Sequence, residues 1–149
     1  MEIKEGYMPF MGYQTYYRIV GKTEEGKSPI ILLHGGPGST HNYFELLDRV
    51  AETGRAVIMY DQLGCGNSFV EGHPELWTPE TWLNELCSLI DYLHIDHFHL
   101  LGQSWGGMLA IIYLIEKQGK GVKSAILSST LSSSKLWASE QHRMIKFMS

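Results

Sequence analysis

The segment 102–106 carries the clearest chemical signal in the 149-residue sequence, because it reads Gly-Gln-Ser-Trp-Gly between two apolar runs. The pattern G-x-S-x-G between a strand and a helix is typical of a sharp, strained turn that exposes a serine. Gly102 and Gly106 stand where a β-carbon would come too close to neighbouring backbone. The Ser104 hydroxyl would project at a helix N-terminus, where free N–H groups stabilise negative charge. The pattern therefore predicts that Ser104 is a nucleophile.

A second glycine-rich loop, residues 34–38, reads His-Gly-Gly-Pro-Gly and also follows an apolar run. Acyl transfer to a serine needs two N–H donors aimed at the developing oxyanion. We expect one donor from Trp105, the residue after the nucleophile, and the other from Gly36, with Gly35 as the near alternative. We interpret His34 as structural rather than as a general base. The remaining residues expected to shape the site are His34, Gly35, Pro37, Gly38, Gly102, Gly106 and Gly107.

These loops must be positioned by alternating strands and helices. Apolar and β-branched runs predict strands over 7–10, 13–20, 29–33, 56–60, 98–101 and 122–127, and helices over 43–52, 79–93 and 105–117. Short apolar strands separated by helices indicate an α/β fold, with a mostly parallel sheet covered on both faces. Ligands bind beyond the carboxyl ends of such strands, so the loops after Leu33, Tyr60 and Leu101 should meet at one site.

Composition excludes several other classes. Twelve Lys and Arg against sixteen Asp and Glu give a net charge of −4, and the basic residues form no cluster, which argues against nucleic-acid binding. Cys65 and Cys87 form no CxxC pair, which argues against a disulfide scaffold or a cysteine-based zinc site and fits a reducing cytoplasm. Residues 98–115 lack charges, but polar residues and glycines among them argue against a membrane span, and no signal peptide is visible.

Two further glycine patterns have structural interpretations. Segment 21–28 fits the phosphate-binding pattern G-x-x-x-x-G-K-[ST], but Pro29 and an expected strand follow where that mechanism needs a helix. We therefore interpret it as a connection between strands. Gly64-x-Gly66 resembles the start of a dinucleotide fingerprint, but Phe69 stands where that fingerprint needs glycine. We interpret the 61–68 loop as a structured turn beside the site.

Histidines and aromatic residues elsewhere also have plain interpretations. A metal site at His94, His97 and His99 is conceivable, but a polar entry to a strand is the favoured interpretation. Cys65 lies in a loop beside the site without a visible base, so we do not expect it to be a nucleophile. Trp77, Trp82 and Trp137 are expected to pack rather than to serve as stacking platforms.

The motifs of loops 34–38, 61–68 and 102–107 together resemble the α/β-hydrolase superfamily and, within it, the prolyl aminopeptidase (proline iminopeptidase) family of serine peptidases, lactic-acid-bacterial type. The resemblance covers nearly all 149 residues, and Leu63 departs from it where an arginine is common. It implies release of N-terminal proline from peptides through an acyl-enzyme on Ser104, with the Gly36 and Trp105 N–H groups as oxyanion hole. It implies no metal and no cofactor. A carboxylesterase and a non-catalytic, hydrolase-like binding module remain alternatives.

The resemblance also implies parts that are missing from this stretch of sequence. Triad residues of this fold follow the order Ser, Asp or Glu, His, yet no Asp follows Ser104, and the remaining candidates are Glu116, Glu140 and His142. We expect the acid, the base and the acidic residues for the substrate amino group beyond Ser149. We therefore expect an incomplete fold, with residues 1–131 as the N-terminal part of the core and 132–149 as the start of a helical cap. Such a chain should be inactive alone, with apolar surface exposed at 122–127. Oligomeric state and peptide length preference stay open.

Overall fold

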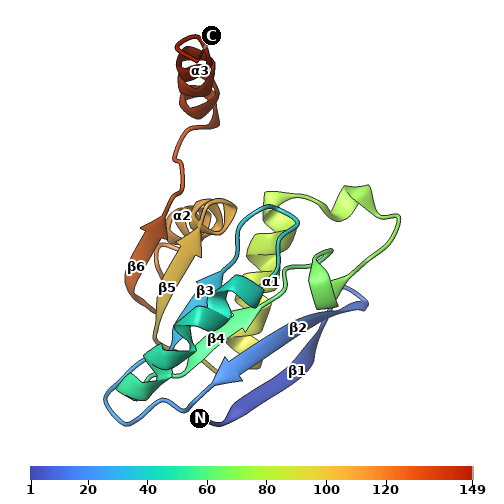
Figure 1. Cartoon of the computed structure of the whole chain (residues 1–149). Coiled ribbons are helices and arrows are strands. Elements are labelled where there is room, and N and C mark those ends of the chain that lie inside the picture. The colour runs from blue at the N-terminus through green and yellow to red at the C-terminus, as the bar shows by residue number, and fades with distance from the viewer. Residues whose placement is uncertain (149) are drawn as a thin grey trace.

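The computed structural model describes residues 1–148, in which six strands form one sheet of order β1-β2-β4-β3-β5-β6 (Figure 1). The antiparallel part contains β1 (Ile3–Phe10) and β2 (Tyr13–Val20), and β2 also pairs antiparallel with β4 (Val57–Tyr60). The parallel part joins β4 to β3 (Ile30–Leu33), β3 to β5 (Phe98–Gln103) and β5 to β6 (Val122–Ser128). The predicted α/β class with a mostly parallel sheet is therefore confirmed.

Helices cover both faces of the sheet, which explains why the central strands are continuously apolar. On one face, helix η1 (Asn42–Thr53) packs Phe44 and Ala51 against a cluster that includes Val57 and Met59. On the other face lie α1 (Pro79–Tyr92) and α2 (Trp105–Glu116), whose side chains join the larger cluster around the opposite sides of β3, β4 and β5. Figure 1 shows η1 in front of the sheet and α1 behind it.

The helix predicted over 43–52 differs from the observed one in its winding, because η1 is a 3-10 helix over Asn42–Thr53. Two shorter 3-10 turns, η2 (Gly66–Ser68) and η3 (Pro74–Leu76), lie in the long connection between β4 and α1. Helix α1 begins where predicted, since the Thr78 hydroxyl accepts a hydrogen bond from the Thr81 N–H and Pro79 occupies the first turn. Segment 21–28 connects β2 to β3, as expected for a connection between strands.

The C-terminal edge of the sheet is uncovered. β6 is the last strand, and Ile126 and Leu127 are 51% and 45% exposed, which agrees with the apolar exposure expected there. Residues 129–133 lead from β6 to α3 (Ser134–Ile145), which stands apart from the sheet in Figure 1. The exposed apolar side chains of α3 are Leu136, Trp137, Met144 and Ile145. Within residues 1–148, no helix is both long and apolar enough to cross a membrane.

Candidate active site

Ser104 occupies the tight turn between β5 and α2. Its backbone lies at φ 54° and ψ −118°, a region that side-chain-bearing residues rarely adopt. The turn is held by hydrogen bonds from the Ser104 N–H to the Ser128 carbonyl (2.9 Å) and from the Thr130 hydroxyl to the Ser104 carbonyl (2.7 Å). The Gly107 N–H also donates to the Ser104 carbonyl. Neighbouring segments therefore hold Ser104 in a strained conformation.

The glycines around Ser104 are required by close contacts. A β-carbon at Gly102 would lie 2.3 Å from the Gly106 carbonyl oxygen, and one at Gly106 would lie 1.9 Å from the Leu33 carbonyl oxygen. A β-carbon at Gly107 would lie 2.5 Å from the side chain of Thr130. Real β-carbons essentially never approach other atoms below 3.0 Å. Glycines therefore allow the start of α2 to pack this closely against β5 at Gly102, against β3 at Gly106 and against Thr130 at Gly107.

The 34–38 loop lies against the turn and presents one free donor. The Gly35 N–H donates to the Tyr43 hydroxyl (2.7 Å), which in turn donates to the Gln103 side-chain oxygen (3.0 Å). Gly36 has φ 121°, a conformation that glycine adopts readily, and its N–H has no acceptor among residues 1–148. The N–H of Trp105 likewise has no acceptor within that stretch. Of the two donors considered in the 34–38 loop, Gly36 is therefore the one that is free.

His34 is fully buried, and both of its ring nitrogens are in hydrogen bonds. Nδ1 donates to the Gly35 carbonyl (2.9 Å), and Nε2 accepts from the Gln62 N–H (2.9 Å). Burial lowers the pKa of His34 below its ordinary value, which favours this neutral tautomer. These bonds leave no ring nitrogen for Ser104, so the geometry agrees with a structural role.

Gln62 was not predicted from the sequence, yet it joins all three loops. Its side-chain N–H donates to the His34 carbonyl, and its side-chain oxygen accepts from the Trp105 indole N–H, both at 2.9 Å. The only sequence signal was its place two residues after the Ala56–Tyr60 run, because loops at the carboxyl ends of strands face the site. Gln62 thereby fixes Trp105, the residue after Ser104, relative to the 34–38 loop.

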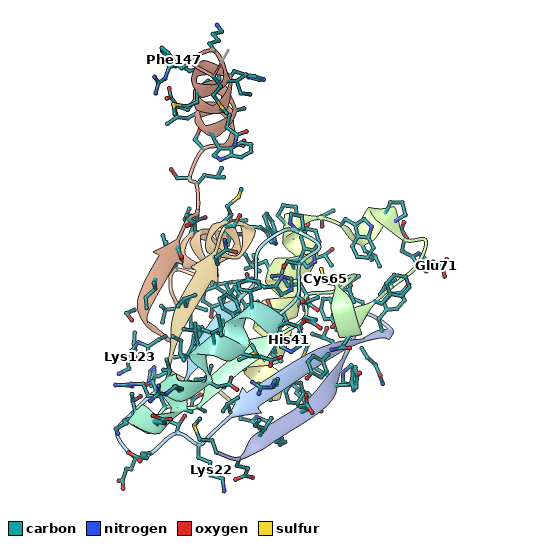
Figure 2. All side chains as sticks on the ribbon, in the orientation of Figure 1. Lys22, His41, Cys65, Glu71, Lys123 and Phe147 are labelled. Carbon is teal, nitrogen blue, oxygen red and sulfur yellow. The ribbon has the colours of Figure 1, made fainter. Side chains whose placement is uncertain are left out.

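Asp61 organises the third loop. Its carboxylate accepts hydrogen bonds from the backbone and ring N–H groups of His41 (2.9 and 2.7 Å) and from the Asn67 N–H (2.9 Å). Burial alone would raise the pKa of Asp61, but the bonds from His41 and Asn67 hold it below its usual value. Figure 2 shows His41 near the start of η1 and Cys65 among the loops at the carboxyl ends of the strands. The 61–68 loop is thus a structured turn fixed by an ionised aspartate.

The described structure brings together the predicted residues of loops 34–38 and 102–107 but supplies no base. Among residues 1–148, no histidine or carboxylate is hydrogen-bonded to the Ser104 hydroxyl. Glu116 ends α2, at the far end of that helix from Ser104, and His142 lies in the detached α3. The described residues also contain no group of three His, Cys, Asp or Glu side chains able to hold a metal ion.

Comparison with known proteins places this geometry in a family. The α/β-hydrolase fold family matches residues 28–148. The chain belongs to this family. A proline iminopeptidase of Clostridioides difficile strain 630 is 68% identical over 149 residues, which are 100% of this chain and 51% of that protein. The proline iminopeptidase of Lactobacillus acidophilus is 63% identical over 150 aligned residues, covering 99% of this chain and 51% of that protein.

Solved structures agree with the fold. The crystal structure of VinJ has a TM-score of 0.87 at 38% identity and covers 95% of this chain and 48% of its own. The crystal structure of a proline iminopeptidase from Mycobacterium smegmatis has a TM-score of 0.82 at 36% identity, covering 91% and 47%. The chain spans about half the length of the curated relatives it matches. The predicted resemblance to the N-terminal half of proline iminopeptidases is therefore confirmed.

Proposed function

We propose that this chain supplies the nucleophile and the oxyanion hole of a serine peptidase that releases N-terminal proline from peptides. The observation that carries the proposal is the strained Ser104 turn with the free N–H groups of Gly36 and Trp105 beside it. Identity of 60–68% to proline iminopeptidases over this half supports the substrate class. The chemistry of this site calls for neither metal nor cofactor, because a serine nucleophile and backbone donors suffice for acyl transfer.

In the proposed reaction, the Ser104 oxygen attacks the prolyl carbonyl carbon while a base takes the hydroxyl proton. The carbonyl oxygen gains negative charge, and the Gly36 and Trp105 N–H groups donate to it. Collapse of this intermediate breaks the amide bond, and the amine leaves with a proton from the same base. Water then attacks the prolyl ester, releasing proline and restoring the Ser104 hydroxyl.

The proposal needs a base, an acid to orient it and groups that bind the substrate amine, and we propose that they lie outside residues 1–148. His34 is excluded as the base because both ring nitrogens are in other hydrogen bonds. We further propose that residues 132–149 begin a cap over the site, since α3 leaves the sheet and exposes apolar side chains. A cytoplasmic location is proposed from the two free cysteines.

A direct test uses the chain alone and the chain continued by the second half of the C. difficile relative. We expect the continued chain to hydrolyse proline 4-nitroanilide and the chain alone to be inactive, because Ser104 lacks a base. Ser104→Ala in the continued chain should lower kcat by about 10⁴-fold or more. Turnover of p-nitrophenyl esters without turnover of the proline amide would indicate a carboxylesterase. Correctly folded protein that turns over neither substrate would indicate a binding module and overturn the proposal.

A further inference from the structure

A small cavity lies beside the proposed oxyanion hole. Its volume is about 290 Å³, near the lower limit for ligand pockets and sufficient for one side chain. Three segments line it: residues 37–38 of the oxyanion loop, residues 63–65 after β4, and the indoles of Trp77 and Trp82. No charged residue is among these lining groups. The cavity therefore suits an uncharged, apolar group.

Aromatic rings connect this cavity to the nucleophile turn. The Trp77 and Trp82 rings are stacked, with centroids 6.4 Å apart and planes at 14°. Trp82 then meets Trp105 edge to face at 5.2 Å, and Trp105 directly follows Ser104. A group held in the cavity would contact Trp82, whose ring contacts Trp105 of the nucleophile turn. The same group would lie against the loop that carries Gly36.

The walls of the cavity are fixed by specific contacts. The Trp82 indole N–H donates to the Leu63 carbonyl at 3.1 Å, so this donor is already used. Gly64 has φ 87°, and a β-carbon there would lie 2.4 Å from the Trp77 ring. Burial raises the pKa of the Cys65 thiol to about 11, so the thiol is neutral at physiological pH. Trp77 is 37% exposed, which leaves the cavity open to solvent on one side.

We propose that this cavity binds the apolar side chain of the residue that follows proline in the substrate, on the leaving-group side of the cleaved bond. The inference rests on the proposed function, which requires a prolyl residue on the acyl side. The charged nitrogen of the substrate's N-terminal proline is part of the proline ring. A cavity without charged lining groups is therefore a poor site for the prolyl residue. The leaving residue brings its side chain without such a charge. The cavity thereby favours leucine or phenylalanine over glycine at that position.

The test uses the Ser104→Ala chain, labelled with ¹⁵N, in which the four tryptophan indole signals can be followed separately. Prolyl-phenylalanine amide should shift the Trp77 and Trp82 signals in a saturable way. Prolyl-glycine amide, the matched probe without the side chain, should bind at least fivefold more weakly. Equal affinity for the two probes, or shifts that avoid Trp77 and Trp82, would overturn the subsite.

Two variants and one control sharpen the test. Trp77→Ala removes one wall and should abolish the preference for prolyl-phenylalanine amide. Gly64→Ala should weaken it by displacing the Trp77 ring. Leu46→Ala, an exposed position on η1 that does not line the cavity, should leave it unchanged. In the continued chain, proline amide turnover without a preference for phenylalanine over glycine would reject the subsite alone, whereas absence of proline amide turnover would reject the proposed function.

Discussion

At the scale of single residues, packing around Gly106 leaves no room for a side chain. Gly106 lies in the first turn of α2 with ordinary helical geometry, where alanine would normally be favoured by about 1 kcal/mol. Here the added β-carbon would lie 1.9 Å from the Leu33 carbonyl oxygen. This clash outweighs the helix preference of alanine, so the substitution should destabilise the fold. We predict that Gly106→Ala lowers the free energy of unfolding by about 3 kcal/mol, measured by urea denaturation.

The control for Gly106 is Gly26, which lies in the β2–β3 connection with open space around it. Gly26→Ala meets no atoms, but φ 76° strains an alanine by about 1 kcal/mol. The two variants therefore separate steric contact from backbone conformation. Equal losses of stability would contradict the contact argument.

Glu85 is a fully buried carboxyl group outside the proposed chemistry. It accepts hydrogen bonds from the Thr15 hydroxyl (2.5 Å) and the Leu63 N–H (3.0 Å). Burial raises its pKa to about 7, although these hydrogen bonds act in the opposite direction. The folded chain therefore keeps the Glu85 proton at a pH where the unfolded chain, with an ordinary glutamate pKa near 4.5, has lost it.

This pKa difference sets the sign of a pH dependence. Because the folded state binds more protons between pH 4.5 and about 7, the contribution of Glu85 to stability is fully present below that window and falls as the pH rises through it. The total change is roughly 3 kcal/mol. Glu85→Gln imitates the protonated form and should remove this part of the slope. The measurement compares urea midpoints of both proteins from pH 4.5 to 8, and parallel profiles would contradict it.

At the scale of elements, Gln62 connects the loops that follow β3, β4 and β5. Replacing it by leucine leaves the Trp105 indole N–H and the His34 carbonyl without their partner in a buried region. Each unpaired buried group costs about 1–3 kcal/mol, so we predict a loss of roughly 3 kcal/mol for Gln62→Leu. Thermal denaturation and the indole signal of Trp105 are the measurements. A shift of that signal without loss of stability would show that the amide only orients the ring.

Sequence alone predicted the elements whose signal is local. The apolar runs of β3 and β4 are almost wholly buried, whereas β5 alternates buried and half-buried residues. Gly102 is forced by a contact with Gly106, four residues further on, but Gly106 is forced by the Leu33 carbonyl, which is distant in the sequence. β1 begins at Ile3, earlier than the expected Tyr7. The prediction missed this start because residues 3–5 are exposed and carry no apolar pattern. The bonds of Gln62 and Tyr43 were not predictable, because they depend on which distant loops meet. The type of a polar residue fixes its donors and acceptors but not the residue with which it forms a hydrogen bond.

At the scale of the whole molecule, the two edge strands of the sheet differ in the residues that they expose. β1 and β6 are both edge strands, each paired on one side only, β1 with β2 and β6 with β5. The β1 edge carries exposed Lys4, Glu5 and Pro9, which oppose pairing with another chain. Ile126 pairs in register with Leu101, which packs against the core cluster under η1. Ile126 itself is half exposed. Exposed strand edges with apolar residues pair readily with other chains. We infer that the β6 edge is the part of the sheet most prone to pair with another chain.

We predict that the chain alone self-associates through β6, so that its apparent mass rises with concentration in size-exclusion chromatography with light scattering. Ile126→Lys should shift the midpoint of association at least fivefold toward higher concentration, because a charge at an edge strand opposes pairing. Leu46→Lys is the matched control, since Leu46 is 85% exposed on η1, away from β6. A wild-type chain that stays monomeric across the range would contradict the prediction. An equal effect of both lysines would assign the association to general hydrophobicity instead of to the strand edge.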